Sequence, residues 1–329
     1  MSEKRSNFVR IMLTMKTILT TLFSLLPMIT WPQSGEMKIV RQRFHRELPP
    51  GNYSGICAIG DGRFAVVDDK APEDGFYVFR IAIDDKKGRI IDIENEGYRS
   101  SGLPNRDMEG ICYCPTTQTL FISGEADNEV YEYGLDGQRT GRRLAMPPEF
   151  KKASKNYGLE ALTYDSRRHL FFTTTEQPLP GDTLLRIQTF DDDLQPRQQY
   201  LYRPDAAEEH IQGVSAMCAL DDGRLLVMER QIRVPKFKLG ARAVTHIYEV
   251  VLPEEGGIVE KRLVKEIKTR LSLTSRRFAN CEGLCEPTPG LLLIVADSQN
   301  RYRGVLRDWF LLLKDTTSSD SISTILEQE

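Results

Sequence analysis

Acidic side chains recur at matching places along this sequence. One set stands at the third position of a short motif that opens an apolar strand: Ser54, Glu109, Glu160, Ser215 and Glu282. A second set stands at the end of the strand that follows: Asp68, Glu125, Glu176, Glu229 and Asp297. Eight of these ten residues are acidic, and carboxylates gathered at one place repel one another unless a cation offsets them. Because oxygen ligands suit Ca²⁺ and a bound cation attracts phosphate, the pattern points to cation and anion chemistry.

The elements that would position these acids form a repeat. The first set recurs at intervals of 55, 51, 55 and 67 residues. In the second unit, the motif at 107–112 leads through a turn to an apolar strand at 119–125 that ends on Glu125. A period of tens of residues indicates a repeat architecture.

Two further strands follow each acid of the second set. The third strands are expected at 76–81, 130–133, 184–187, 246–250 and 309–313, and more polar fourth strands at 88–94, 138–144, 195–202 and 257–265. Four antiparallel strands repeated around a ring make a β-propeller. We therefore predict an all-β protein with five blades visible in the sequence, and a sixth could be assembled from the terminal segments. Since paired strands of a hairpin run antiparallel, both sets of acids should lie on one rim.

Three interpretations of these acids stay open. They could form a metal or substrate site at the central channel. They could instead accept backbone N–H bonds from the next blade and lock the blades together, because a residue repeated in every blade often serves the repeat. They could also be simply solvated.

The N-terminal residues of the sequence suggest that the protein is exported. Lys16 precedes an apolar run at 18–29 that is followed by small polar residues up to Gly35, as in a secretory signal, and Met15 would make a better start than Met1. We expect a signal peptide at 1–35, a propeller domain at 36–315 and a tail at 316–329. We also expect a strand within 36–50 that pairs with the last blade and closes the ring. The mature protein would be periplasmic or secreted.

Composition excludes several classes of function. A net charge of -3 gives no electrostatic case for nucleic acid, and the apolar run is too short to span a membrane. No Gly-x-Ser-x-Gly elbow, Walker loop or His-Glu-x-x-His motif occurs, and the four histidines form no ligand pattern. Four of the six cysteines occupy one column of the repeat, too far apart for disulfides, so we predict none. We expect a monomer.

With these residues in place, the chain resembles the phytase-like family, also described as having the esterase-like activity of phytase. The resemblance covers about residues 52–300. It rests on Ser54-Gly-Ile, Asp68, Asp107-Met-Glu109-Gly-Ile, Ser123-Gly-Glu125, Asn156-Tyr-Gly-Leu-Glu160-Ala-Leu, Glu176-Gln-Pro-Leu179, Glu229-Arg230, Asn280-Cys-Glu282-Gly-Leu and Asp297-Ser-Gln-Asn300. It implies an exported propeller that hydrolyses an ester or phosphoester.

Together these observations predict a hydrolase that acts on an anionic or ester small molecule at the acidic rim. The expected Ca²⁺ ligands are Glu109, Glu125, Glu160, Glu176, Glu282 and Asp297, and a metal-bound water would be the nucleophile. Arg230, in a long basic loop at 230–242, would clamp the anion, with Glu229 and Asn300 beside the substrate. No catalytic base is identified. The alternative is a non-catalytic propeller that binds a ligand or a protein partner at the same mouth.

Overall fold

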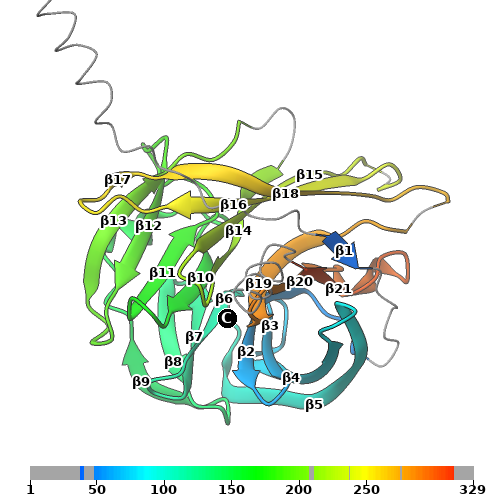
Figure 1. Cartoon of the computed structure of the whole chain (residues 1–329), viewed down its shortest axis with the longest axis horizontal. Helices are drawn as coiled ribbons and strands as arrows, with labels where there is room; N and C mark the ends of the chain where they lie inside the picture. Colours follow the sequence, from blue (N-terminus) through cyan, green and yellow to red (C-terminus); the bar gives the residue numbers. More distant parts are fainter. Residues whose placement is uncertain (1–37, 41–47, 207–210, 237, 275, 315–329) are drawn as a thin grey trace, which may run out of the picture. The chain divides into compact units, whose positions relative to one another are not determined.

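Five antiparallel sheets stand around a common centre in the computed structural model (Figure 1). The structure describes residues 38–40, 48–206, 211–236, 238–274 and 276–314, all within the compact unit that begins at Gly35. The expected signal peptide and the expected tail lie outside these residues. The described residues therefore form a β-propeller of five blades, as the repeat predicts.

Blade one shows how the sequence builds each unit. Strands β2 (Tyr53–Gly60), β3 (Arg63–Asp68), β4 (Glu73–Asp84) and β5 (Arg89–Pro104) follow one another in the sheet. Asp61 and Gly62 join β2 to β3, and both have positive φ, 53° and 69°. Two such residues suit the tight turn whose twist matches that of a hairpin.

The other blades repeat this order. Blade two contains β6 (Met108–Cys114), β7 (Thr119–Gly124), β8 (Glu129–Tyr133) and β9 (Arg139–Arg143). Blade three contains β10 (Leu159–Asp165), β11 (Leu170–Thr175), β12 (Leu185–Phe190) and β13 (Pro196–Tyr202), with β17 (Gly257–Ile258) parallel at its edge. Blade four contains β14 (Ile211–Ala219), β15 (Leu225–Arg233), β16 (Arg242–Val251) and β18 (Glu260–Arg270). Blade five contains β19 (Asn280–Thr288), β20 (Leu291–Asp297) and β21 (Trp309–Lys314). The described part of the chain also contains two short 3-10 helices in loops, η2 (Pro148–Lys152) and η3 (Asn300–Tyr302).

The ring closes through the start of the chain. Strand β1 (Lys38–Val40) pairs antiparallel with β21 and completes blade five as its outermost strand. This confirms the closing strand expected within 36–50, for the part of that range that the structure describes.

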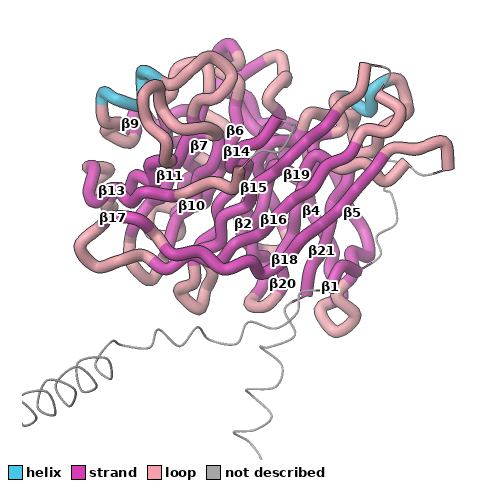
Figure 2. Tube along the Cα trace, turned by 90° about the horizontal axis from the view of Figure 1, so that it is seen from above, coloured by secondary structure: helices cyan, strands magenta, loops and turns pink. Residues whose placement is uncertain are grey.

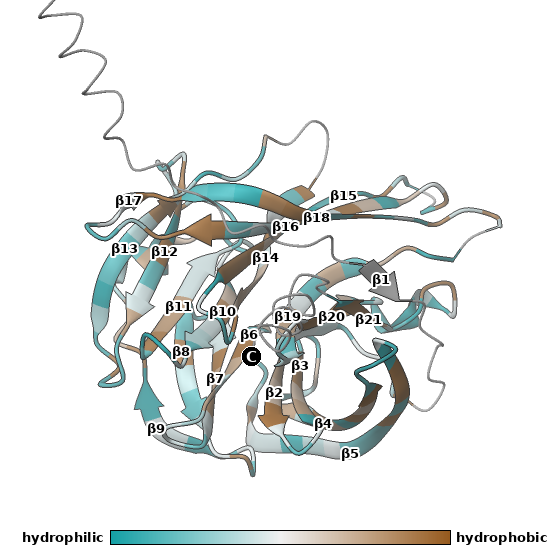
Figure 3. Ribbon diagram, viewed as in Figure 1, coloured by the Kyte–Doolittle hydropathy of each residue, from teal (hydrophilic) through white to brown (hydrophobic). Residues whose placement is uncertain are grey.

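The core lies between the blades. Five clusters of buried apolar side chains each join two neighbouring blades, so that the set runs around the whole ring. Outer strands such as β9 are mostly hydrophilic, whereas β14 at the centre is largely hydrophobic (Figure 3). This pattern fits first strands that are covered on both faces.

Glycine lets the five first strands approach closely. A Cβ at Gly55 would lie 2.2 Å from the carbonyl oxygen of Glu109 in the next blade, which is far inside van der Waals contact. At Gly110 a Cβ would lie 2.7 Å from the backbone nitrogen of Leu162. A side chain there would push neighbouring blades apart.

One expected loop is partly strand. The basic segment at 230–242 forms the tip of a hairpin, because β15 continues to Arg233 and β16 begins at Arg242. Pairing of Ile232 with Ala243, both buried, extends the two strands.

Candidate functional site

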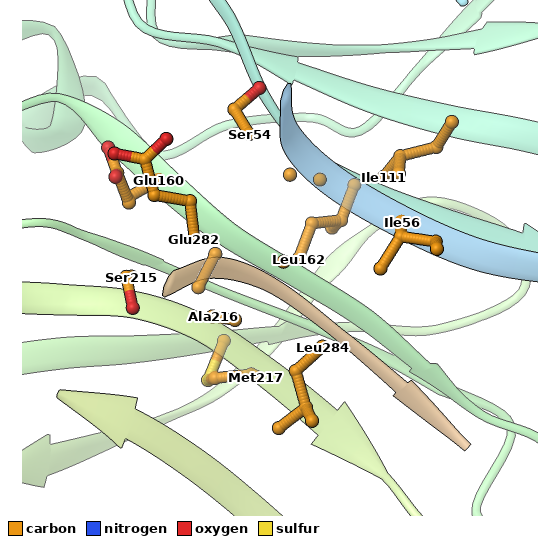
Figure 4. Close-up of a pocket in the computed structure, with 14 residues that line it drawn as sticks. Ser54, Ile56, Ile111, Glu160, Leu162, Ser215, Ala216, Met217, Glu282 and Leu284 are labelled. Atoms are coloured by element: carbon orange, nitrogen blue, oxygen red, sulfur yellow. The ribbon is translucent and has the colours of Figure 1, made fainter. Parts of the chain in front are cut away.

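A β-bulge sits at the same place in every first strand. The pairing register with the second strand shifts between Tyr53 and Gly55, Met108 and Ile111, Leu159 and Ala161, Val214 and Ala216, and Cys281 and Gly283. The residues on these bulges, the first ring, are Ser54, Glu109, Glu160, Ser215 and Glu282. A bulge bends its strand and re-aims a side chain. All five side chains are buried, and Ser54, Glu160, Ser215 and Glu282 gather on one side of a shared pocket (Figure 4).

The strand register also defines a second ring. The residues that pair with the position before each bulge are Asp68, Gly124, Thr175, Glu229 and Ala296. The residue that follows each of these pair partners occupies the same position in every blade. These five residues form the second ring: Asp69, Glu125, Glu176, Arg230 and Asp297. In blades one and four this is one residue later than Asp68 and Glu229, the positions assigned from the sequence. The two rings together are called the mouth below.

Arg230 is the centre of a charge network in the mouth. Its guanidinium donates to Oε1 of Glu160 at 3.2 Å, to Oε1 of Glu176 at 3.1 Å, and to Glu282. It also donates to Oδ1 of Asn280 at 3.3 Å. The side chain thus reaches from blade four to blades three and five. Burial lowers the pKa of Arg230, but Glu160 and Glu176 outweigh it, and the pKa is raised overall.

Burial also has the largest effect on the pKa of Glu160, Glu125 and Asp297. It raises the pKa of Glu160 well above the usual range, against the opposing effect of Arg230. Burial likewise raises the pKa of Glu125 and Asp297, although each accepts a backbone N–H, from Gly158 and Gln299 respectively. The bond from Gly158 to Glu125 joins two blades, as the locking interpretation expects.

Glu109 stands apart from this network. It is only 8% exposed, and its carboxylate has no hydrogen-bond or ion-pair partner among the described residues. Burial, then the charges of Glu160 and Asp69, raise its pKa well above the usual range. A buried acid without a partner is costly, and this marks Glu109 as a functional candidate.

Two groups of carboxylates have the geometry of a cation site. Asp69, Asp107 and Glu109 form one, and Glu125, Glu160 and Glu176 form the other. In each, one oxygen per residue lies within 4.8 Å of the others, which is compatible with the ligand distances of Ca²⁺. In the first group, Oδ1 of Asp69 is buried without a hydrogen-bond partner, and burial raises the pKa of Asp69 to about 7. The residues present therefore fit a hard cation.

Lys70 already supplies a positive charge to the first group. Its Nζ lies 2.6 Å from Oδ2 of Asp69 and 2.5 Å from Oδ1 of Asp107. Asp69, Lys70 and Asp107 were not among the site residues predicted from the sequence. The acidic doublet Asp68-Asp69, and the position of Asp107 within the repeated motif, were the signals that could have found them.

Two residues expected beside the substrate lie away from this network. Glu229 is bound by Oη of Tyr202 at 2.5 Å and by Nζ of Lys261 at 2.6 Å, because adjacent residues of β15 face opposite ways. Asn300 is exposed in η3.

Below the acidic mouth, the lining of the central channel becomes apolar. One apolar residue from each blade lines the pocket at the mouth: Ile56, Ile111, Leu162, Met217 and Leu284 (Figure 4). The same five residues also line a cavity of about 190 Å³ beyond it. They form an apolar belt between the two. Cys57, Cys112, Cys218 and Cys285 line the far cavity, and burial raises the pKa of each thiol. All six cysteines are free in the structure.

The fold and the site together define the class of protein. It is a five-bladed β-propeller whose bulged first strands direct acids to one mouth. The chain belongs to the phytase-like family, described as esterase-like activity of phytase, which it matches over residues 49–298. Comparison with curated proteins gives no match.

Solved structures offer distant similarity only. An endo-arabinase from Bacteroides thetaiotaomicron is 12% identical with a TM-score of 0.46, covering 84% of this chain and 97% of its own. A virginiamycin B lyase from Staphylococcus aureus is 12% identical with a TM-score of 0.37, covering 79% and 82%. An aldose sugar dehydrogenase from Streptomyces coelicolor is 11% identical with a TM-score of 0.43, covering 86% and 99%. Likeness at this level carries no argument about activity. Within the described residues, no helix is long and apolar enough to cross a membrane.

Proposed function

We propose that the protein is a hydrolase that cleaves a phosphoester or related ester at the acidic mouth. The observation that carries this proposal is Glu109, a buried carboxyl without a hydrogen-bond partner and with a raised pKa. A buried carboxyl that lacks a partner is compensated when a cation binds beside it, so Glu109 suits the role of Ca²⁺ ligand expected from the sequence. Membership of the phytase-like family supports the ester class of substrate.

The same proposal includes the binding of Ca²⁺ by the carboxylates of the mouth. Asp69, Asp107 and Glu109 would hold one ion, while Glu125, Glu160 and Glu176 could hold another. The remaining expected ligands, Glu282 and Asp297, would complete the acidic surroundings. A bound Ca²⁺ would offset carboxylate repulsion and polarise an anionic ester. Arg230 would hold the acids in place and present its charge to the substrate.

The test is turnover of a phosphomonoester and a carboxylic ester by the purified protein, with Ca²⁺ and with chelator. We expect activity with Ca²⁺ that the chelator removes and that Glu109→Gln abolishes. Ca²⁺-independent activity would refute the metal role, and full activity of Glu109→Gln would refute the role of Glu109.

A second candidate function rests on Arg230. This side chain already pairs with three carboxylates of the mouth and supplies a positive charge there without a metal. That arrangement favours a non-catalytic propeller that binds a ligand or partner at the mouth. It predicts no turnover of either ester, together with ligand binding that Glu160→Gln weakens.

Export and a monomeric state also remain proposals. N-terminal sequencing of protein from the periplasm or culture medium would test cleavage near Gly35, and sedimentation would test the mass.

A further inference from the structure

Three segments that are far apart in sequence form one lobe beside the mouth. They are residues 231–242, 268–279 and 298–307, called the basic lobe here. Together with the adjacent Ala243, their buried apolar side chains form one cluster: Ile232, Ala241, Leu271, Phe278 and Leu306. Hydrogen bonds from Gly240 N to Leu271 O at 2.9 Å and from Lys238 Nζ to Gln299 Oε1 at 2.8 Å join the segments. Figure 1 shows the ends of β15 and β18 reaching over blade five, and Figure 2 shows their loops near η3.

The lobe is strongly basic, although Lys268 pairs with Glu266 at 2.7 Å and Arg301 pairs with Asp308, two acids just outside its segments. Its sequence contains no Asp or Glu, and its basic residues are Arg233, Lys236, Lys238, Arg242, Lys268, Arg270, Arg276, Arg277, Arg301, Arg303 and Arg307. The mouth, by contrast, is acidic, and Asn280 and Asp297 lie where the two regions meet.

Three of these arginines stand directly opposite one another in the sheet. Arg233 pairs with Arg242 across β15 and β16, and Arg242 pairs with Arg270 across β16 and β18. Like charges directly opposite destabilise a sheet. Arg242 and Arg270 are exposed and have no ion-pair partner in the described part of the chain. Arg242 and Arg270 are therefore available to pair with an external anion.

The same loops expose large apolar side chains. Leu273 is 90% exposed, Leu239 50%, Val234 44% and Tyr302 36%. A soluble anion or a nucleic acid would be attracted by the charges alone and would gain nothing from exposed leucines. Basic residues interleaved with exposed apolar ones are typical of surfaces that bind a lipid interface.

We propose that the basic lobe docks the protein on a membrane surface that contains anionic phospholipids. The arginines contact the headgroups, and Leu239 and Leu273 insert between them. This binding is peripheral, and it does not depend on whether the mouth is catalytic.

The experiment is co-sedimentation of the full chain with vesicles. Phosphatidylglycerol–phosphatidylcholine vesicles should bind the protein, and pure phosphatidylcholine vesicles should not. Each basic residue near an anionic surface changes the affinity about fivefold, so Arg242→Gln with Arg270→Gln should weaken binding about thirtyfold. The matched control, Lys86→Gln with Lys152→Gln, removes the same charge from exposed sites outside the lobe and should have little effect.

The apolar contribution has its own test. Leu273→Ser should weaken vesicle binding several-fold, whereas Ile91→Ser, at a side chain 60% exposed on blade one, should not. Leu273→Trp should show blue-shifted emission with anionic vesicles. Binding of soluble polyphosphate as tight as that of vesicles, with no effect of Leu273→Ser, would overturn the proposal in favour of a polyanion site. Equal losses in the lobe and control variants, or equal binding to neutral vesicles, would also overturn it.

Discussion

Replacing Arg230 by methionine removes the guanidinium that pairs with Glu160, Glu176 and Glu282 inside the mouth. Methionine fills much of the same volume, so lost charge rather than lost packing dominates the effect. Breaking a buried ion pair by removing one partner costs about 3–5 kcal/mol, because the other partner stays buried and uncompensated. For a domain of this size, that loss corresponds to a decrease in melting temperature of roughly 6–20 °C.

The stability lost in Arg230→Met should depend on pH and should increase as the pH rises. The pKa of Glu160 is raised even though Arg230 opposes the shift, so it rises further in the variant. A carboxyl whose pKa is higher in the folded state contributes stability that is present below its unfolded pKa and is lost as pH rises through its folded pKa. The penalty should therefore be larger at pH 8 than at pH 5, by about 1.4 kcal/mol for each pKa unit of further shift.

Urea unfolding at both pH values, followed by fluorescence, measures this difference. Arg197→Met is the control, because that side chain is 62% exposed and pairs with Asp191 at the surface. It should lose only about 0–1 kcal/mol. A loss below 1 kcal/mol for Arg230→Met at pH 8, or an equal loss at both pH values, would refute the charge network as the source of stability.

Three further predictions concern the mouth and the packing around it. Glu109→Gln should gain stability relative to the wild type as pH rises, because the raised pKa of Glu109 makes ionisation of the buried acid unfavourable; thermal melts from pH 5 to pH 8 would show the trend or its absence. Ca²⁺ at a hundred times its dissociation constant should stabilise the fold by about 2.7 kcal/mol, and Asp69→Asn should reduce that gain; an unchanged melting temperature in the wild type would exclude binding. Gly55→Ala should destabilise the protein by about 1–3 kcal/mol or more, because its Cβ would meet the carbonyl oxygen of Glu109 at 2.2 Å; a variant as stable as the wild type would show that the blades can separate at little cost.

The repeat explains why the fold was predictable. Apolar strands of fixed order, with turn residues such as Asp61-Gly62 between them, specify the blades locally. Closure by β1 was predictable too, because a ring with an open edge would need a partner for β21. The strand register at the mouth could not be predicted from the sequence. A shift of one residue turns a side chain to the other face of a strand, and aligning acids with acids selected Asp68 and Glu229 in place of Asp69 and Arg230.

The roles of individual residues in the mouth could not be predicted from the sequence, for a second reason. The bulges that aim Glu160 and Glu282 at the axis depend on the pairing of two strands and leave no mark in composition. Arg230 reads in sequence as the first residue of a basic loop, yet it is buried between three blades. The cysteine column, in contrast, follows directly from the repeat, since equivalent positions line one cavity.

The pairing of β1 with β21 also constrains the order of assembly. Lys38 pairs with Lys314, so β1, the outer strand of blade five, has no partner strand until β21 is present. Blades one to four draw their four principal strands from consecutive sequence and can form as the chain emerges, but the final sheet must wait. A chain that crosses a membrane while still unfolded would therefore complete its ring only on the far side, after its last strand has arrived.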